Sequence, residues 1–131
     1  MSVVVGYVPR PEAEAALDHA VAEARSRGTL LVVVNTSRGD ALVDQRYVDD
    51  EQLGALEQRL DEAGVEHLVV HGMHGRDASE ELLAVAQEHR ADLIVIGLRR
   101  RTPVGKLLMG STAQRVLLDA LCPVLAVKPS R

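Results

Sequence analysis

Aromatic residues are almost absent from this chain. It has 131 residues, of which two are tyrosine and none is phenylalanine or tryptophan. Apolar residues still make up 47% of the sequence, so the core must be built from Val, Leu, Ile and Ala. This length suits one ordinary domain with a single real core.

Cysteine pairs, targeting segments and an excess of basic charge are also missing. The one cysteine excludes an internal disulfide framework and fits a reducing compartment. No signal-peptide pattern and no apolar run of membrane length occurs, so we expect a cytoplasmic protein without a membrane partner. The net charge of −4 argues against a general nucleic-acid partner, and any basic site must be local.

Short apolar runs alternate with helical patterns along the whole chain. We expect strands at 2–8, 30–34, 66–71, 92–97 and 124–128. We expect the first three intervening helices to end near Gly28, Gly64 and His89, the third with a capping pair formed by Asp77 and Glu80. Continuously apolar strands between helices are typical of a parallel sheet covered on both faces. Right-handed crossovers then predict a five-stranded doubly wound α/β fold, whose strand order these patterns leave open.

A loop rich in glycine and arginine joins the fourth strand to the last helix. Gly97 ends the strand, the cluster Arg99–Arg101 follows, and Gly110 precedes a helix that starts at Ser111 or Thr112. Glycines let a ligand approach the main chain closely, the first helical N–H groups lack partners, and the helix dipole favours negative charge. The loop therefore predicts an anion site with cationic side chains nearby.

The last helix has a bland interpretation of its own. We expect one apolar face to be formed by Ala113, Val116, Leu117, Ala120 and Leu121. The spacing of Ser111 and Gln114 matches a capping box, in which the serine hydroxyl bonds the helix's own N–H groups. Capping and ligand binding draw on the same amides, so the two roles of Ser111 partly exclude each other.

The same loop resembles the nucleotide loop of the universal stress protein family, written Gly-x2-Gly-x9-Gly-Ser/Thr. Gly97, Gly110 and Ser111 match the pattern, and Arg100 stands where its second glycine belongs. The resemblance covers length, element order and the ending Cys122–Lys128, so residues 1–131 are identified as one universal stress protein domain. It implies an adenine-nucleotide alpha-hydrolase-like sheet with strand order 3-2-1-4-5. Ligands of such sheets bind at the switch point, here between strands 1 and 4.

This resemblance also implies a ligand and its contacts. We expect an adenine nucleotide, in the first place ATP with or without Mg²⁺, with AMP or cyclic AMP as alternatives. The residues expected to hold the phosphates are Gly97, Arg99, Arg100, Gly110, Ser111 and Thr112. Those expected to border the nucleoside are Val8, Val34 and Asn35. Nucleotide-binding members usually carry an aspartate where this chain has Val8, so a contact to the nucleoside is lost and the valine would pack on the adenine ring instead.

No catalytic or metal-binding residues are expected. The crevice offers no Ser-His-Asp or paired-carboxylate arrangement, so ATP hydrolysis would be very slow at most. His71 and His74 have a spacing seen in metal sites, but no cysteine or carboxylate pair completes a closed zinc site.

Two further expectations concern partners. The apolar run Val124–Val127 lies at a predicted sheet edge, and an uncovered edge tends to pair with another chain, so we expect a homodimer through the last strand. Val8 and Arg100 favour an alternative function, a nucleotide-free stress-response interaction module that acts as a dimer. An enzyme of the ATP-pyrophosphatase type would need a Ser-Gly-Gly loop after strand 1, which Val8–Pro11 does not supply.

Overall fold

A five-stranded parallel sheet organises the computed structural model, which describes residues 1–7, 11–35, 50–71, 77–100, 107–108 and 110–129. Its strands are β1 (Ser2–Tyr7), β2 (Leu30–Asn35), β3 (His67–His71), β4 (Ala91–Gly97) and β7 (Val124–Val127). Their order is β3-β2-β1-β4-β7, with every neighbouring pair parallel. Because β7 is the fifth strand of this sheet, the order 3-2-1-4-5 is confirmed.

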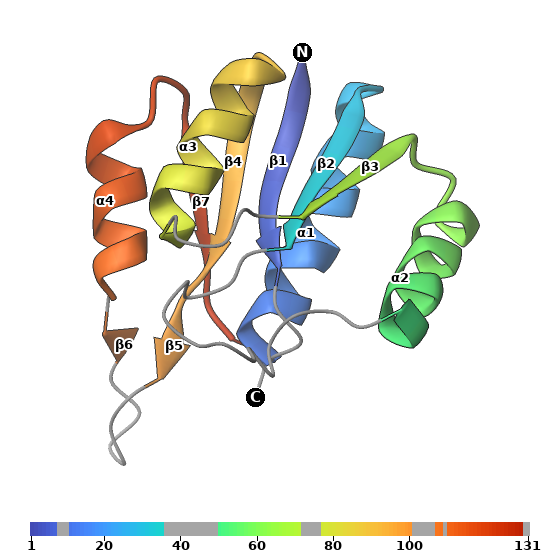
Figure 1. Ribbon diagram of the computed structural model, residues 1–131, viewed down its shortest axis with the longest axis horizontal. Helices are drawn as coiled ribbons and strands as arrows, with labels where there is room; N and C mark the ends of the chain where they lie inside the picture. Colours follow the sequence, from blue (N-terminus) through green and yellow to red (C-terminus); the bar gives the residue numbers. More distant parts are fainter. Residues whose placement is uncertain (8–10, 36–49, 72–76, 101–106, 109, 130–131) are drawn as a thin grey trace.

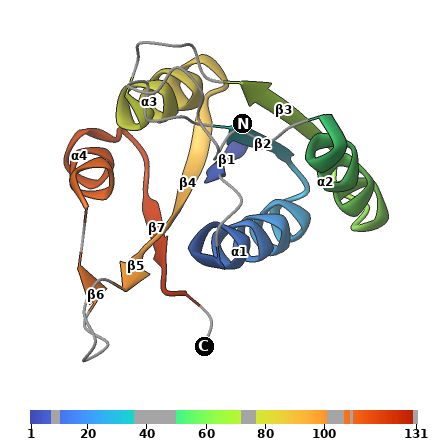
Figure 2. The ribbon, with the colours of Figure 1, turned by 60° about the horizontal axis from the view of Figure 1, so that its bottom comes forward.

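Helices cover both faces of the sheet, as Figure 2 shows. The four helices are α1 (Pro11–Arg27), α2 (Asp50–Glu62), α3 (Ala78–Glu88) and α4 (Ser111–Asp119). The first two pack on one face and the last two on the other, giving two apolar clusters separated by the sheet. The doubly wound α/β class predicted from the alternating pattern is therefore confirmed.

The central strands are buried on both faces, which explains their continuous apolar sequences. Val3 and Val5 pack towards α1 while Val4 packs towards α3, and all three are fully buried. Gly6 keeps α3 close to β1, because a Cβ on this glycine would lie 3.1 Å from a methyl carbon of Leu82. The shortage of aromatic side chains is thus met by thin valine layers and closely packed helices.

Two of the predicted helix ends rest on left-handed glycines. Gly28 has φ +62° and Gly64 has φ +71°, a backbone conformation that side chains disfavour. Beyond each glycine the next amide bonds back into the helix, from Thr29 to Ala24 O and from Val65 to Leu60 O. These bonds satisfy carbonyls at the ends of α1 and α2, as the position of each glycine in the sequence predicted.

The segment between β4 and α4 differs from the loop expected there. Two short strands, β5 (Arg99–Arg100) and β6 (Leu107–Leu108), pair antiparallel in a small separate ribbon. Strands of two residues carry no readable period, so only the tertiary pairing defines them. Among the described residues, no helix combines the length and apolarity needed to cross a membrane.

The end of α4 was also predicted wrongly. The helix stops at Asp119, and Ala120 already has extended backbone with ψ 141°. Leu121 therefore leaves the helical face assigned to it and is 93% exposed, while Ala113 and Val116 on that face are buried as expected. Leu121 follows the turn into β7, which the helical spacing of apolar residues could not reveal.

Candidate functional site

The carboxyl ends of the parallel strands share one edge of the sheet, the lower edge in Figure 1. β1 and β4 are neighbours there, although the chain makes β2 and β3 between them. Successive connections leave these two strands in opposite directions across the sheet, which is the switch point where such folds bind ligands. Among described residues Tyr7 ends β1 and Gly97 ends β4, while Val8 lies outside the described residues.

The predicted phosphate loop begins at this edge. Gly97 is half-buried, and the next amide, of Leu98, donates to Val127 O at 2.8 Å, so the chain stays attached to β7 as it leaves the sheet. Arg99 and Arg100 then pair with the two residues of β6. The ribbon brings the two ends of the loop together and leads the chain back to α4 (Figure 1). Only the backbones of the two arginines are described.

The start of α4 is open. Gly110 is the N-cap, its carbonyl accepts the first helical bond from Gln114 N at 3.0 Å, and no side chain caps the helix. The amides of Ser111 and Thr112 therefore have no helical acceptor. Both residues are exposed, and the first turn contains no acidic residue that would repel an anion.

Two expectations about this helix start need correction. Ser111 is the first helical residue instead of the N-cap, so its predicted capping box with Gln114 does not form. Gly110 has φ −73° and ψ 170°, an extended conformation that any residue adopts. If a side chain is excluded at Gly110, the cause is the space that a ligand needs, and backbone strain plays no part.

The nucleoside end of the predicted site is less open. Val34 is fully buried and its side chain packs in the cluster on the α3 face, so only its backbone is available at the edge. Asn35, the last residue of β2, is also fully buried. Its Nδ2 donates to His71 Nδ1 at 3.1 Å, and its Oδ1 has no partner among the described residues.

Asn35 belongs to a polar row that the sequence analysis did not assemble. Tyr7 pairs with Asn35 in register, and Asn35 pairs with His71, so the row crosses three adjacent strands on one face. Each of these residues is the last of its strand, and this shared position is the signal that could have found the row. His71 was considered only with His74, which lies outside the described residues.

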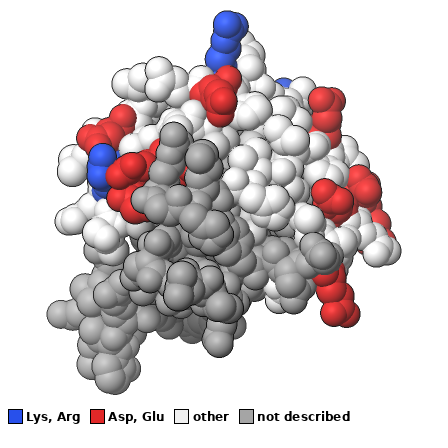
Figure 3. Space-filling model, in the orientation of Figure 1, with Lys and Arg blue, Asp and Glu red and all other residues white. Residues whose placement is uncertain are grey.

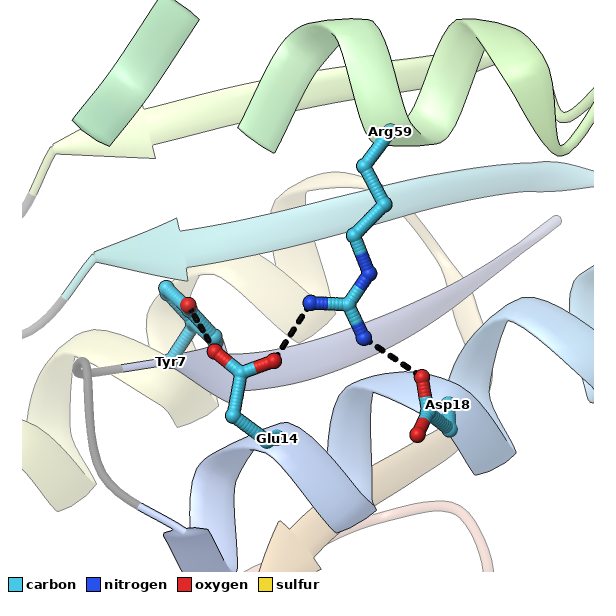
Figure 4. A network of polar contacts seen from close by, with 4 residues as sticks. All are labelled: Tyr7, Glu14, Asp18 and Arg59. Atoms are coloured by element: carbon cyan, nitrogen blue, oxygen red, sulfur yellow. Dashed lines mark hydrogen bonds and ion pairs between the residues drawn. The ribbon is translucent and has the colours of Figure 1, made fainter. Parts of the chain in front are cut away.

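A second polar network extends from Tyr7 (Figure 4). The Tyr7 hydroxyl donates to Glu14, and Arg59 of α2 bonds both Glu14 and Asp18 of α1, the latter at 2.5 Å. Burial, then the hydrogen bond to Glu14, raises the pKa of Tyr7. Burial alone would raise the pKa of Glu14, but bonds from Tyr7 and Arg59 outweigh it and lower that pKa. The network ties α1 to α2 and engages both oxygens of this carboxylate.

The described surface offers little further charge for an anion. On the face in Figure 3, acidic side chains are scattered and basic ones form no continuous patch among the described residues. Within the same part of the chain, no group of three or more His, Cys, Asp or Glu side chains is placed to hold a metal ion.

A cavity of about 350 Å³ lies elsewhere, at the amino ends of β4 and β7 between α3 and α4. Leu83, Ala86, Leu121 and Cys122 contribute to its lining. Burial and the nearby Asp92 raise the pKa of the Cys122 thiol, which makes this cysteine a poor nucleophile. The cavity is far from the strand ends and does not coincide with the predicted crevice.

Comparison with known proteins gives the same family as the loop. The sequence profile described as "Universal stress protein family" matches residues 1–128. A universal stress protein of Mycolicibacterium smegmatis is 46% identical over 127 residues, which cover 97% of each chain.

Solved structures match over the same extent. The universal stress protein of Archaeoglobus fulgidus in complex with dAMP is 28% identical, with a TM-score of 0.70 and 98% of each chain covered. A universal stress protein in complex with cAMP is 26% identical, with a TM-score of 0.70, covering 99% of this chain and 98% of the other.

Proposed function

Because the chain belongs to the universal stress protein family, we propose that it binds an adenine nucleotide where β4 leads into α4. The observation that carries this proposal is the open start of α4, where Gly110 leaves the amides of Ser111 and Thr112 without helical partners. The dAMP and cAMP complexes of the two similar proteins support it. We propose ATP as the ligand, with AMP and cyclic AMP as the alternatives.

In this proposal the phosphates bind along the loop and the nucleoside lies over the ends of β1 and β2. The phosphate contacts come from Gly97, Arg99, Arg100, Gly110, Ser111 and Thr112. Val8, the backbone of Val34 and Asn35 border the nucleoside. Any Mg²⁺ would be held mainly by ATP phosphates and water, since the described side chains supply no cluster of ligands.

We further propose a cytoplasmic regulator with negligible ATP hydrolysis. The single cysteine of the chain supports a reducing compartment. Glu14, a carboxylate on the first turns of α1, has both oxygens bonded to Tyr7 and Arg59, so it is poorly placed to activate a water. Turnover that exceeds background and disappears in Ser111→Ala would contradict this part of the proposal.

A homodimer through β7 is the third part of the proposal. β7 is an edge strand whose Val124, Leu125 and Ala126 are only partly buried. Bonds from Ile94 N to Pro123 O and from Leu98 N to Val127 O show that alternate residues of β7 face β4. Ala126 therefore presents its N–H to the open edge. Ala126→Pro should convert dimer to monomer in light scattering, and an unchanged assembly would reject pairing at this edge.

Calorimetric titration of wild type with ATP, AMP and cyclic AMP tests the nucleotide proposal. Arg100→Ala should weaken ATP binding by removing a cation, and the deficit should shrink as salt rises because screening weakens charge contacts. Nucleotide released from heat-denatured protein identifies the ligand carried from the cell. If wild type binds none of the three nucleotides, the proposal fails and the interaction module takes its place.

A further inference from the structure

The side-chain amide of Asn35 presents a buried acceptor that nothing described satisfies. Asn35 is 0% exposed, and its Oδ1 has no hydrogen-bond partner among the described residues. Buried carbonyl oxygens are nearly always paired, because an unpaired one keeps the cost of losing water. This oxygen therefore calls for a donor from outside the described part of the chain.

His71 determines which end of the amide is unpaired. An amide NH₂ group only donates, so the 3.1 Å contact makes His71 Nδ1 the acceptor and places the ring hydrogen on Nε2. A half-turn of the amide would set its oxygen against the lone pair of Nδ1. The histidine thus keeps Oδ1 on the side away from itself.

We propose that Asn35 selects a purine with a 6-amino group, and that His71 is the positioning residue that gives the amide this selectivity. Oδ1 accepts from the amino group of adenine, and the second hydrogen of Nδ2 can donate to an adjacent ring nitrogen. Hypoxanthine carries an oxygen at position 6, so the fixed amide would face it with acceptor against acceptor. This inference rests on the proposed nucleotide site and deepens it.

The place of Asn35 in the sheet fits the base end of that site. It ends β2, beside Tyr7 of β1, and β4 is the next strand beyond β1. Neighbouring strands are about 4.8 Å apart, so β2 and β4 are separated by about 10 Å, a span on the scale of a nucleoside. A base at Asn35 would leave its phosphates on the side of Gly97 and α4. Because Oδ1 is covered, the base must displace its cover, which slows association.

Paired titrations with ATP and ITP test this selectivity, since the two differ at position 6 of the base. Wild type should prefer ATP by about tenfold or more, the scale of a good amide–adenine pair. In His71→Ala the amide is free to turn, so the ITP-to-ATP ratio of Kd values should fall towards one. His71→Gln offers a carbonyl oxygen in place of Nδ1 and should restore much of the preference.

His67 supplies a matched control on the same strand and face. It lies at the amino end of β3, where its Nδ1 is 3.0 Å from Val65 O. His67→Ala should leave the nucleotide preference unchanged, and thermal unfolding checks that each variant folds. If His71→Ala does not fold, His71→Gln and an Asn35→Ala variant carry the comparison, with the preference kept in the first and lost in the second.

The outcomes separate this inference from the proposed function. Equal binding of ATP and ITP by wild type would overturn the selectivity while leaving nucleotide binding in place. A preference that survives in His71→Ala would overturn the positioning role of His71. Absence of binding by wild type to either nucleotide would overturn the proposed function, and the inference with it.

Discussion

Two helices of the same face begin at the same edge of the sheet, and their first turns are built in opposite ways. At α3, Asp77 is the N-cap and its Oδ1 accepts from Glu80 N at 3.0 Å and from Ser79 Oγ at 2.5 Å. At α4, Gly110 is the N-cap and no side chain bonds the free amides. The chain therefore satisfies one helix start internally and leaves the other open.

The charges around the two helix starts follow the same division. Glu80 and Glu81 lie in the first turn of α3, whereas α4 has no acidic residue there. Arg115 of α4 reaches across to α3, 3.8 Å from Asp77 and 3.9 Å from Glu80. The positive end of α3 is thus neutralised by its own acids, while that of α4 remains available to an anion.

Giving α4 the cap of α3 should have the largest effect. Gly110→Asp places a carboxylate on the same amides, and the extended backbone of Gly110 accepts the side chain without strain. ATP should lose two charge-assisted hydrogen bonds of about 1.5–3 kcal/mol each, so binding should be undetectable in calorimetry. Thermal stability should stay level or rise.

A charge control separates capping from simple repulsion. Gln114→Asp adds the same charge at an exposed position one turn further along α4 and should weaken ATP binding only slightly. If Gly110→Asp binds ATP as wild type does, the nucleotide lies elsewhere and the open helix start has no part in binding.

Removing the cap of α3 should have the next largest effect, on stability instead of binding. Asp77→Ala leaves the amide of Glu80 without its acceptor and should cost about 1 kcal/mol, lowering Tm by a few degrees. ATP affinity should not change. Scanning calorimetry and titration of the same sample measure both, and a parallel loss of affinity would mean that the two helix starts are coupled.

The contribution of Asp77 should also depend on pH. Hydrogen bonds from Ser79 and from Glu80 N lower the pKa of this carboxyl below its unfolded value. A lowered folded pKa gives stability that is present above the unfolded pKa of about 3.9 and is lost as pH falls through the folded value. The Tm difference between wild type and Asp77→Asn should therefore narrow with acidification below about pH 4. A constant difference down to pH 2 would contradict this.

The smallest effect should come from the serines that follow the two caps. Ser111 does not cap α4, so Ser111→Ala should change stability by no more than about 0.5 kcal/mol while lowering ATP affinity a few-fold. Ser79 is buried and bonded to Asp77, so Ser79→Ala should destabilise more and leave affinity alone. The reverse ranking in urea unfolding would show that Ser111 does support the helix.

Local sequence signals predicted most of the fold because they act within a few residues. Continuous apolar runs located the five strands of the sheet, and Gly28 and Gly64 ended their helices as expected. Asp77 was placed correctly as a cap because the cap and its acceptor amide are three residues apart. The ribbon of β5 and β6 escaped detection since its pairing joins residues across a connection that carries no period.

By itself, the sequence determined the class of fold, the loop that resembles a nucleotide site and the absence of aromatic anchors for a base. The tertiary structure alone decided which polar groups meet: Asn35 with His71 across β2 and β3, and Glu14 with Arg59 between α1 and α2. It also made Gly110, instead of Ser111, the first cap of α4. Periodicity reports the environment of each residue along its own element, whereas hydrogen-bond partners depend on register and packing between elements distant in the chain.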